Sequence, residues 1–347
     1  IAAAPEFTMA HALRAWLFLV GTDAEAVPLA REALAQARAL PANAREARHL
    51  AAIGHWCAGR WRLAARTLED LSLDHPHDLL ALQLGQQLDF FTGDQRLLRD
   101  RIARALPAWS PDMPGYHALL GMYAFGLEEN GDFHNAERYG RRAIELEPRD
   151  AWAQHAVVHV LEMQGRRDDG IRWMTGQPGW KQCGLLAVHN WWHLALFHLE
   201  AMDLAGALAL HDAHQGSAHA VLTLQRLDGA ALLWRLRLLD AEGTLDLAAR
   251  WSDLAQGWDL TPRDAGHSAF NDVHMLIALI GLRDAARAQS LFAAVQRRAE
   301  RGSDSNAAMA REVGLPLMRA LLAYERGEVD AAADALYAAR GQAQRFG

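Results

Sequence analysis

A turn-plus-helix pattern recurs along this chain of 347 residues. Its order is Gly, a polar residue, a bulky residue, two spacers and Ala, followed by an apolar stripe. One copy begins at Gly131 and ends at Pro148, and another begins at Gly59 and ends at Pro76. A repeat of this kind restricts the chain to architectures in which the same supersecondary unit is used several times.

The spacing of the glycines indicates the type of repeat. The interval from Gly59 to Gly93, and again from Gly131 to Gly165, is 34 residues. A 34-residue helix–turn–helix period with small residues at close-packing positions is typical of tetratricopeptide repeats. Gly permits the turn between two helices, Ala lets them approach, and Pro stops the second helix. One hairpin cannot bury its apolar face alone, so neighbouring hairpins stack. The sequence therefore predicts an all-α fold, a right-handed α-α superhelix (solenoid) of tetratricopeptide-like helical hairpins.

Weaker copies of the pattern extend the array toward both ends of the chain. They lie around Gly21, Asp203, Arg283 and Gly327. The connectors between copies are rich in Pro, Gly or polar residues but are too short for flexible interdomain linkers. These connectors span residues 106–115, 175–179, 215–217 and 260–263.

The repeat also sets the expected domain boundaries. We expect residues 9–347 to form a single tetratricopeptide-like solenoid domain, with a subtle break near residue 180. Residues 1–8 precede Met9 and resemble vector-derived sequence, so we leave them out of the predicted domain.

The composition argues against several classes of partner. Acidic and basic residues alternate along the chain and the formal net charge is -7, so we expect no nucleic-acid partner and no anionic lipid surface. No segment approaches the roughly 18 apolar residues of a membrane span. Cys57 and Cys183 lack CxxC spacing, which disfavours a disulfide or a cysteine zinc site and fits a cytoplasmic protein.

Histidines are concentrated in the middle of the chain. Of the 17 in the sequence, His155 and His159 precede Glu162 at helical spacing, and His189 and His193 form a second pair. Residues at i, i+4 and i+7 share one face of a helix. Within the repeat register the first set falls at the fifth, ninth and twelfth positions, which face the concave groove in tetratricopeptide arrays. Two adjacent helices are therefore expected to direct four imidazoles and a carboxylate into one channel.

This cluster has two interpretations. A single His among apolar residues is usually a structural side chain. Several polar residues on apolar helices cost desolvation free energy, however, unless they hydrogen-bond to one another or bind a ligand. Two His from one helix with His and Glu from others also form a legitimate zinc or iron ligand set, so a divalent metal is one cofactor to consider. The sequence has no HExxH motif, and His-x3-His alone is a weak pattern. Of Trp191 and Trp192, which point about 100° apart on a helix, we expect one in the core and one on the pocket wall.

Several longer motifs resemble one family. The motifs are GMYAFGL at 121–127, DAW at 150–152, HAVVHVLEM at 155–163, HNWWHLAL at 189–196 and FNDVH at 270–274, with DHPHDLLAL at 74–82 and WSPDMP at 109–114. Together they resemble the tetratricopeptide-repeat protein 38 family from about residue 40 to 300. At Trp191–Trp192 the family is expected to have two different aromatic residues. This difference concerns only the shape of the pocket.

The resemblance implies an α-solenoid and a shared polar pocket. The residues that match its pattern are His155, His159, Glu162, His189, Asn190, His193, Asp228, Arg235, Asn271, Asp272 and His274, and we add Trp192 as a wall.

The leading functional hypothesis is a protein that binds a small polar ligand or short peptide in a concave, His-rich groove. The first alternative is an enzyme in which His159, His193 or Asp272 is catalytic, with His as general acid or base oriented by Glu162 or Asp272. The second alternative is a protein-interaction scaffold with structural histidines. The sequence leaves open whether the protein forms a homo-oligomer.

Overall fold

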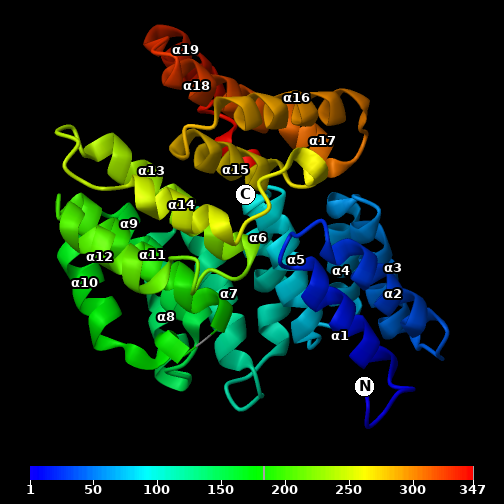
Figure 1. Ribbon diagram of the computed structural model, residues 1–347. Helices are drawn as coiled ribbons and strands as arrows, with labels where there is room; N and C mark the ends of the chain where they lie inside the picture. The colour runs from blue at the N-terminus through cyan, green and yellow to red at the C-terminus, as the bar shows by residue number, and fades with distance from the viewer. Residues whose placement is uncertain (183, 347) are drawn as a thin grey trace. The chain divides into compact units, whose positions relative to one another are not determined.

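The described part of the chain is helical throughout (Figure 1). The computed structural model describes residues 1–182 and 184–346, and these form α-helices joined by turns, with no strand among them. The all-α prediction is confirmed, and helices that follow one another along the chain pack in pairs, such as α7 with α8 and α18 with α19. Cys57 is a free, buried thiol, whereas Cys183 lies outside the described residues.

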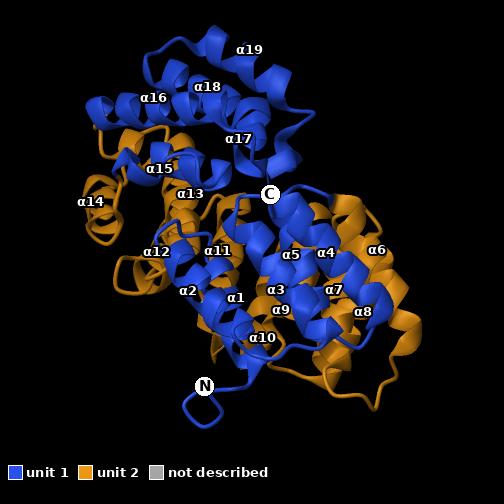
Figure 2. Cartoon of the chain, turned by 90° about the vertical axis from the view of Figure 1, so that its right-hand side faces the viewer, with its two compact units in different colours: residues 1–94, 261–276, 285–347 blue, residues 95–260, 277–284 orange. Residues whose placement is uncertain are grey.

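The chain divides into two compact units (Figure 2). The first comprises residues 1–94, 261–276 and 285–347, and the second comprises residues 95–260 and 277–284. Residue 180, where the sequence suggested a subtle break, lies inside the second unit.

The first unit contains the N-terminal helices and most of the C-terminal ones. Its α-helices are α1 (Thr8–Leu19), α2 (Ala26–Arg38), α3 (Ala44–Cys57), α4 (Trp61–Asp74), α5 (Leu79–Phe91), α16 (Ala285–Arg301), α17 (Ser305–Met309), α18 (Leu315–Glu325) and α19 (Val329–Ala339). Its short turns are the 3-10 segments Pro262–Asp264 and Ala343–Phe346 and the π segment Ala310–Gly314. Helix α15 (Ala269–Gly281) begins in this unit and ends in the other.

The second unit contains the histidine-rich helices. Its α-helices are α6 (Gln95–Ala105), α7 (Tyr116–Glu128), α8 (Phe133–Leu146), α9 (Ala151–Met163), α10 (Arg167–Gly176), α11 (Gly184–Glu200), α12 (Leu204–His214), α13 (Thr223–Leu239) and α14 (Ala248–Gln256), with 3-10 turns at Leu106–Ala108 and Pro178–Gln182. Helix α9 packs against α7, α8, α10 and α11, and α11 also packs against α12 and α13.

One backbone geometry explains the repeating glycines. After α7, Gly131 adopts a left-handed φ of 78° and its N–H donates to the Glu128 carbonyl at 2.8 Å, while the Asp132 N–H donates to the Leu127 carbonyl at 2.9 Å. This Schellman arrangement satisfies carbonyls that the helix end would otherwise leave free. The same left-handed residue and pair of backbone hydrogen bonds recur at Gly59, Gly93, Gly165, Met202, Arg283 and Gly327.

Small residues let the helices of the second unit approach closely. Ala136 and Ala143 of α8 are fully buried. A Cβ on Gly140 would lie 2.6 Å from Val157 Cγ2 of α9, closer than packed carbons come. Helix α9 packs closely against its neighbours, and most of its residues are buried.

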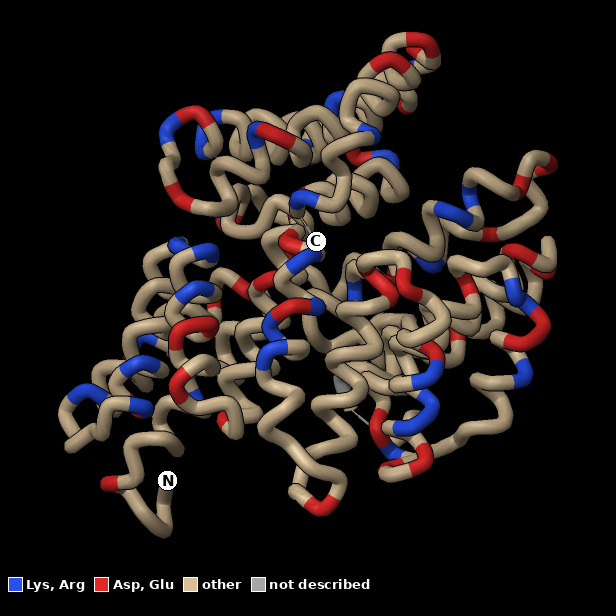
Figure 3. The backbone as a smooth tube through the Cα atoms, turned by 180° about the vertical axis from the view of Figure 1, so that it is seen from behind, with Lys and Arg blue, Asp and Glu red and all other residues tan. Residues whose placement is uncertain are grey.

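Charged residues are interspersed along the helices. Lys and Arg alternate with Asp and Glu over the tube in Figure 3. Among the described residues no helix has the length and apolar character needed to cross a membrane.

Candidate metal centre

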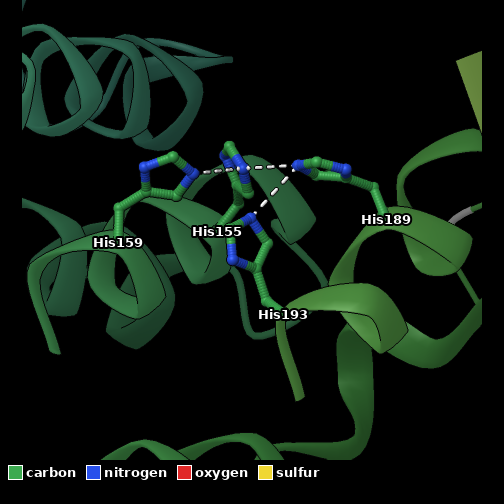
Figure 4. Close-up of side chains that lie close together, drawn as sticks. All are labelled: His155, His159, His189 and His193. Carbon is green, nitrogen blue, oxygen red and sulfur yellow. Dashed lines mark hydrogen bonds between the residues drawn. The ribbon is translucent and has the colours of Figure 1, made fainter. Parts of the chain in front are cut away.

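Four imidazoles from two neighbouring helices meet at one point (Figure 4). His155 and His159 belong to α9, and His189 and His193 belong to α11. The Nε2 atom of His155 lies 2.9 Å from that of His159 and 3.0 Å from that of His189, whose Nε2 is 3.1 Å from that of His193. Each of the four rings therefore presents the same nitrogen to a common centre.

Local hydrogen bonds position the two helices. The Asp150 side chain accepts from the Ala153 N–H and so caps the N-terminus of α9, a role that suits Asp. Asn190 of α11 is fully buried and its Nδ2 donates to the Ala151 carbonyl at 3.4 Å. Asn190, predicted as a pocket residue, thus ties α11 to the first turn of α9.

Three carboxylates lie behind the imidazoles. His189 Nδ1 is 3.0 Å from Asp228 Oδ1 of α13. His193 Nδ1 is 3.1 Å from Glu162 Oε2. A carboxylate accepts hydrogen bonds when ionised, so each ring must carry its proton on Nδ1 and leave the Nε2 lone pair directed at the centre.

The third carboxylate belongs to Glu128 at the end of α7. Its Oε2 atom lies 3.4 Å from His159 Nδ1, which is within ion-pair range although the two groups are not aligned as a hydrogen bond. Glu128 is 5% exposed. A buried carboxylate at this distance favours a proton on His159 Nδ1 as well.

Without a metal ion, the four imidazoles have too few protons to form a hydrogen bond at every contact between their Nε2 atoms. With three rings protonated on Nδ1, only His155 has a proton to place between the Nε2 atoms. The Nε2 atoms of His189 and His193 then face each other with lone pairs at 3.1 Å. One additional proton or one cation must occupy the cluster, and a metal ion would satisfy all four lone pairs at once.

Burial opposes adding protons to most of these rings. Desolvation, together with the charge of His159, holds the pKa of His155 and of His193 well below the usual range. Burial would lower the pKa of His159 too, but the Glu128 carboxylate and the charges of Glu129 and Glu162 outweigh it and raise that pKa. His155 and His193 therefore favour the neutral form, which is the form that binds metals, whereas the neighbouring carboxylates favour a charged His159.

The spacing of the nitrogens fits a small metal ion. A tetrahedral centre with bonds of about 2.0–2.1 Å places its ligand atoms about 3.3–3.4 Å apart. The three Nε2–Nε2 distances given above are 2.9–3.1 Å, a few tenths of an ångström below that value, and one ligand atom from each of the four rings lies within 4.8 Å of the others. A second set of ligand atoms, from Glu128, Glu129 and His159, lies within 4.8 Å of one another and shares one ring with the first.

Aromatic side chains surround the four rings. Phe125 contacts His155 and His159 with ring centroids 5.5 and 5.6 Å apart, and Trp192 stacks on His189 at 5.4 Å. The side chains of His159 and His189 remain 23% and 30% exposed. Two rings of the cluster are therefore partly exposed to solvent, and aromatic side chains lie beside them in addition to the carboxylates.

The two neighbouring tryptophans have different environments. Trp191 packs on Trp180 and stacks on His214 with centroids 3.8 Å apart, whereas Trp192 lies beside His189 and below the guanidinium of Arg235. Trp191 is the core residue and Trp192 lines the histidine cluster.

The remaining predicted residues lie in the first unit and have local partners. Asn271 Nδ2 donates to Thr22 Oγ1 at 3.0 Å. The buried Asp272 carboxylate accepts from the Gly266 N–H at 3.0 Å. His274 Nδ1 lies 2.9 Å from the Phe270 carbonyl.

Glu128, Glu129 and Phe125 were not predicted from the sequence. A signal for the first was present, since Glu128 precedes the turn glycine Gly131 by three residues, as Glu162 precedes Gly165. Reading the repeat register back by one hairpin would have placed Glu128 beside the histidines. A comparison of the sequence with models of known protein families finds no match.

Proposed function

We propose that His155, His159, His189 and His193 bind one divalent transition-metal ion through Nε2, and that the protein uses this centre to bind a small polar ligand. The observation that carries the proposal is the orientation of the rings. Carboxylates from three helices hold Nδ1, so the lone pairs of Nε2 converge. Carboxylate–histidine pairs of this kind are the usual support of metal-ligating imidazoles.

The ligand set indicates which metals to expect. Imidazole nitrogens suit Zn, Cu, Fe and Ni, whereas Mg and Ca prefer carboxylate, carbonyl and water oxygens. Four neutral imidazoles carry no charge to balance the positive charge of the ion that they would bind. The carboxylates of Glu128, Glu162 and Asp228 supply that compensation from behind the rings.

We further propose that the helical hairpins stack as right-handed tetratricopeptide-like solenoids and that the chain belongs to the tetratricopeptide-repeat protein 38 family. The recurrent Schellman turns and the motifs around the histidines support this assignment. A groove of such an array suits a small polar molecule or, as the alternative, a short peptide, in a cytoplasmic protein.

Metal analysis tests the central proposal. The protein is stripped with a chelator and titrated with Zn²⁺, Co²⁺, Ni²⁺ and Cu²⁺, and bound metal is quantified by mass spectrometry of the elements. We expect one ion per chain and a loss of binding in the double variant His155→Ala/His189→Ala. His198→Ala is the matched control, because His198 is on α11 but pairs with Asp203 instead of the cluster.

Two outcomes would contradict the proposal: no stoichiometric uptake of any of these metals, or equal uptake by wild type and the double variant. Turnover of a metabolite panel by the metal-loaded protein separates an enzyme from a binding protein. An enzyme would show metal-dependent turnover that the double variant loses, and a binding protein would show affinity without turnover.

A further inference from the structure

Arg235 lies beside the candidate metal centre. It follows Asp228 by seven residues on α13, which is about two helical turns, so the two side chains share a face. Its guanidinium carbon is 5.3 Å from the centroid of Trp192. That ring is in turn 5.4 Å from the ring of His189 and 5.0 Å from the ring of His193.

The guanidinium of Arg235 has unused hydrogen-bonding capacity. Nη1 donates to the Ala231 carbonyl at 3.2 Å, and among the residues that the structure describes no carboxylate forms an ion pair with it. Other arginines of the same unit are paired, such as Arg166 with Glu137 and Arg250 with Asp212. A guanidinium has five N–H donors in a planar fork, so most of the donors of Arg235 are available.

Arg235 is exposed to solvent and is also close to other charged groups. The residue is solvent-exposed, yet desolvation by nearby protein lowers its pKa, against the opposing charges of Glu162 and Asp228. Its positive charge also reaches the cluster, where it helps to lower the pKa of His193. A cation that is accessible to solvent, partly desolvated and without an ion-pair partner is well placed to receive an anion.

We propose that Arg235 anchors the carboxylate of a small monoanionic ligand whose other polar group would bind the metal as a fifth ligand, beside the four imidazoles. This inference rests on the proposed function. A carboxylate matches the guanidinium fork with two parallel hydrogen bonds. The acidic groups of Glu128, Glu162 and Asp228 nearby disfavour a dianion such as phosphate, because like charges repel more strongly as the ligand charge rises.

Spectroscopic titration of the Co²⁺-loaded protein tests the anchor. The probes are acetate and N-acetylglycine as carboxylates, N-acetylglycinamide as the neutral analogue, and inorganic phosphate as the dianion, each up to 50 mM. We expect N-acetylglycine to bind the wild type about 10- to 100-fold more tightly than its amide, and Arg235→Gln to abolish that difference while keeping one Co²⁺ per chain. Arg235→Lys should recover part of it, because Lys keeps the charge but not the fork.

Arg237→Gln is the matched control, since Arg237 is on the same helix but contacts Trp234. Failure of both carboxylates to bind, equal binding by Arg235→Gln, or tighter binding of phosphate than of carboxylates would each overturn the inference. If the wild type takes up no Co²⁺, the proposed metal centre itself fails. Uptake of Co²⁺ without Arg235-dependent binding of carboxylates overturns only the role of Arg235.

Discussion

Two groups of polar residues on apolar helices, those of α9 and α11 and those of α15, differ in how their hydrogen-bonding capacity is used. In α9 and α11 the Nε2 atoms of four imidazoles face one another, and His155 Nδ1 is buried without a hydrogen-bond partner. In α15 each polar group contacts the protein around it: Asn271 binds the turn at Thr22 and Asp272 accepts from a backbone N–H.

The difference distinguishes a site from a structural network. Buried polar groups cost free energy unless they are hydrogen-bonded, so a structural network consumes its donors and acceptors internally. A cluster whose acceptors point at a shared centre needs an additional proton or a bound cation there. The hydrogen bonds of the polar residues of α15 are those of a structural network, whereas the cluster of α9 and α11 has the arrangement that the proposed metal site requires.

The largest expected effect is the loss of metal affinity in His159→Ala. Removing one of four ligands should weaken binding by more than about 100-fold, since loss of a mere supporting partner already costs about 10–100-fold. The metal-free variant should melt close to wild type, because His159 is partly exposed and its removal relieves crowding of protonatable groups. Calorimetric metal titration and thermal melts measure the two effects. A strong drop in the metal-free melting temperature with unchanged affinity would make this cluster structural.

A smaller loss of affinity is expected when the support behind one ring is removed. Asp228→Asn keeps the size of the side chain but no longer demands a proton on His189 Nδ1. Metal affinity should fall by about 10–100-fold, with one ion per chain retained. Competition against a chromophoric chelator measures the change. If Asp228→Asn bound the metal as tightly as the wild type, the Asp228 carboxylate would have no role in the site.

Asp272 should make stability depend on pH. Burial raises the pKa of its carboxyl to about 7, against the opposing Gly266 N–H, whereas the unfolded chain has its usual value near 3.8. The folded state therefore prefers the protonated acid. This stabilisation is complete below pH ~4 and is lost as pH rises through about 7, so ionisation of Asp272 costs stability at neutral pH.

The variant Asp272→Asn isolates this contribution. Subtracting its free energy of unfolding from that of wild type cancels the histidine titrations common to both. We expect this difference to fall by about 1–2 kcal/mol from pH 5 to pH 8, measured by urea unfolding. If the difference in the free energy of unfolding did not vary with pH, the carboxyl of Asp272 would not be protonated preferentially in the folded state.

The smallest effect is expected for Asn271→Ala. Its amide supports Thr22, a buried residue in a left-handed conformation with φ 58° that β-branched side chains disfavour. Loss of this hydrogen bond should cost about 1 kcal/mol of stability and leave metal affinity unchanged. If Asn271→Ala bound metal more weakly at normal stability, the polar residues of α15 could no longer be separated from those of α9 and α11.

Much of the site could be predicted from the spacing of residues along a helix. Residues four apart on a helix project together, so His155 was expected beside His159 and His189 beside His193. The carboxylates were predicted less completely. Glu162 lies on the same helix as a histidine pair, but Glu128 comes from α7 and reaches His159 only because α7 packs against α9.

The turns, too, were predicted only in part from the sequence. Their glycines revealed the 34-residue period, because Gly adopts a left-handed backbone without steric cost. Met202 and Arg283 adopt that conformation with φ 56° and 57° although neither is a glycine, at the turns where the sequence has only weaker copies of the repeat. The same pair of backbone hydrogen bonds closes the turn there around a residue that carries a side chain.

The sequence by itself determined the helices, the period of their turns and which histidines share a face, since these depend on hydrogen bonds and sterics among residues a few positions apart. The tertiary structure decided that Nε2 rather than Nδ1 faces the centre, which carboxylate lies behind each ring, and that Asn271, Asp272 and His274 have local structural partners. Those outcomes depend on the distance and rotation between packed helices, which are set by the side chains of both helices at once.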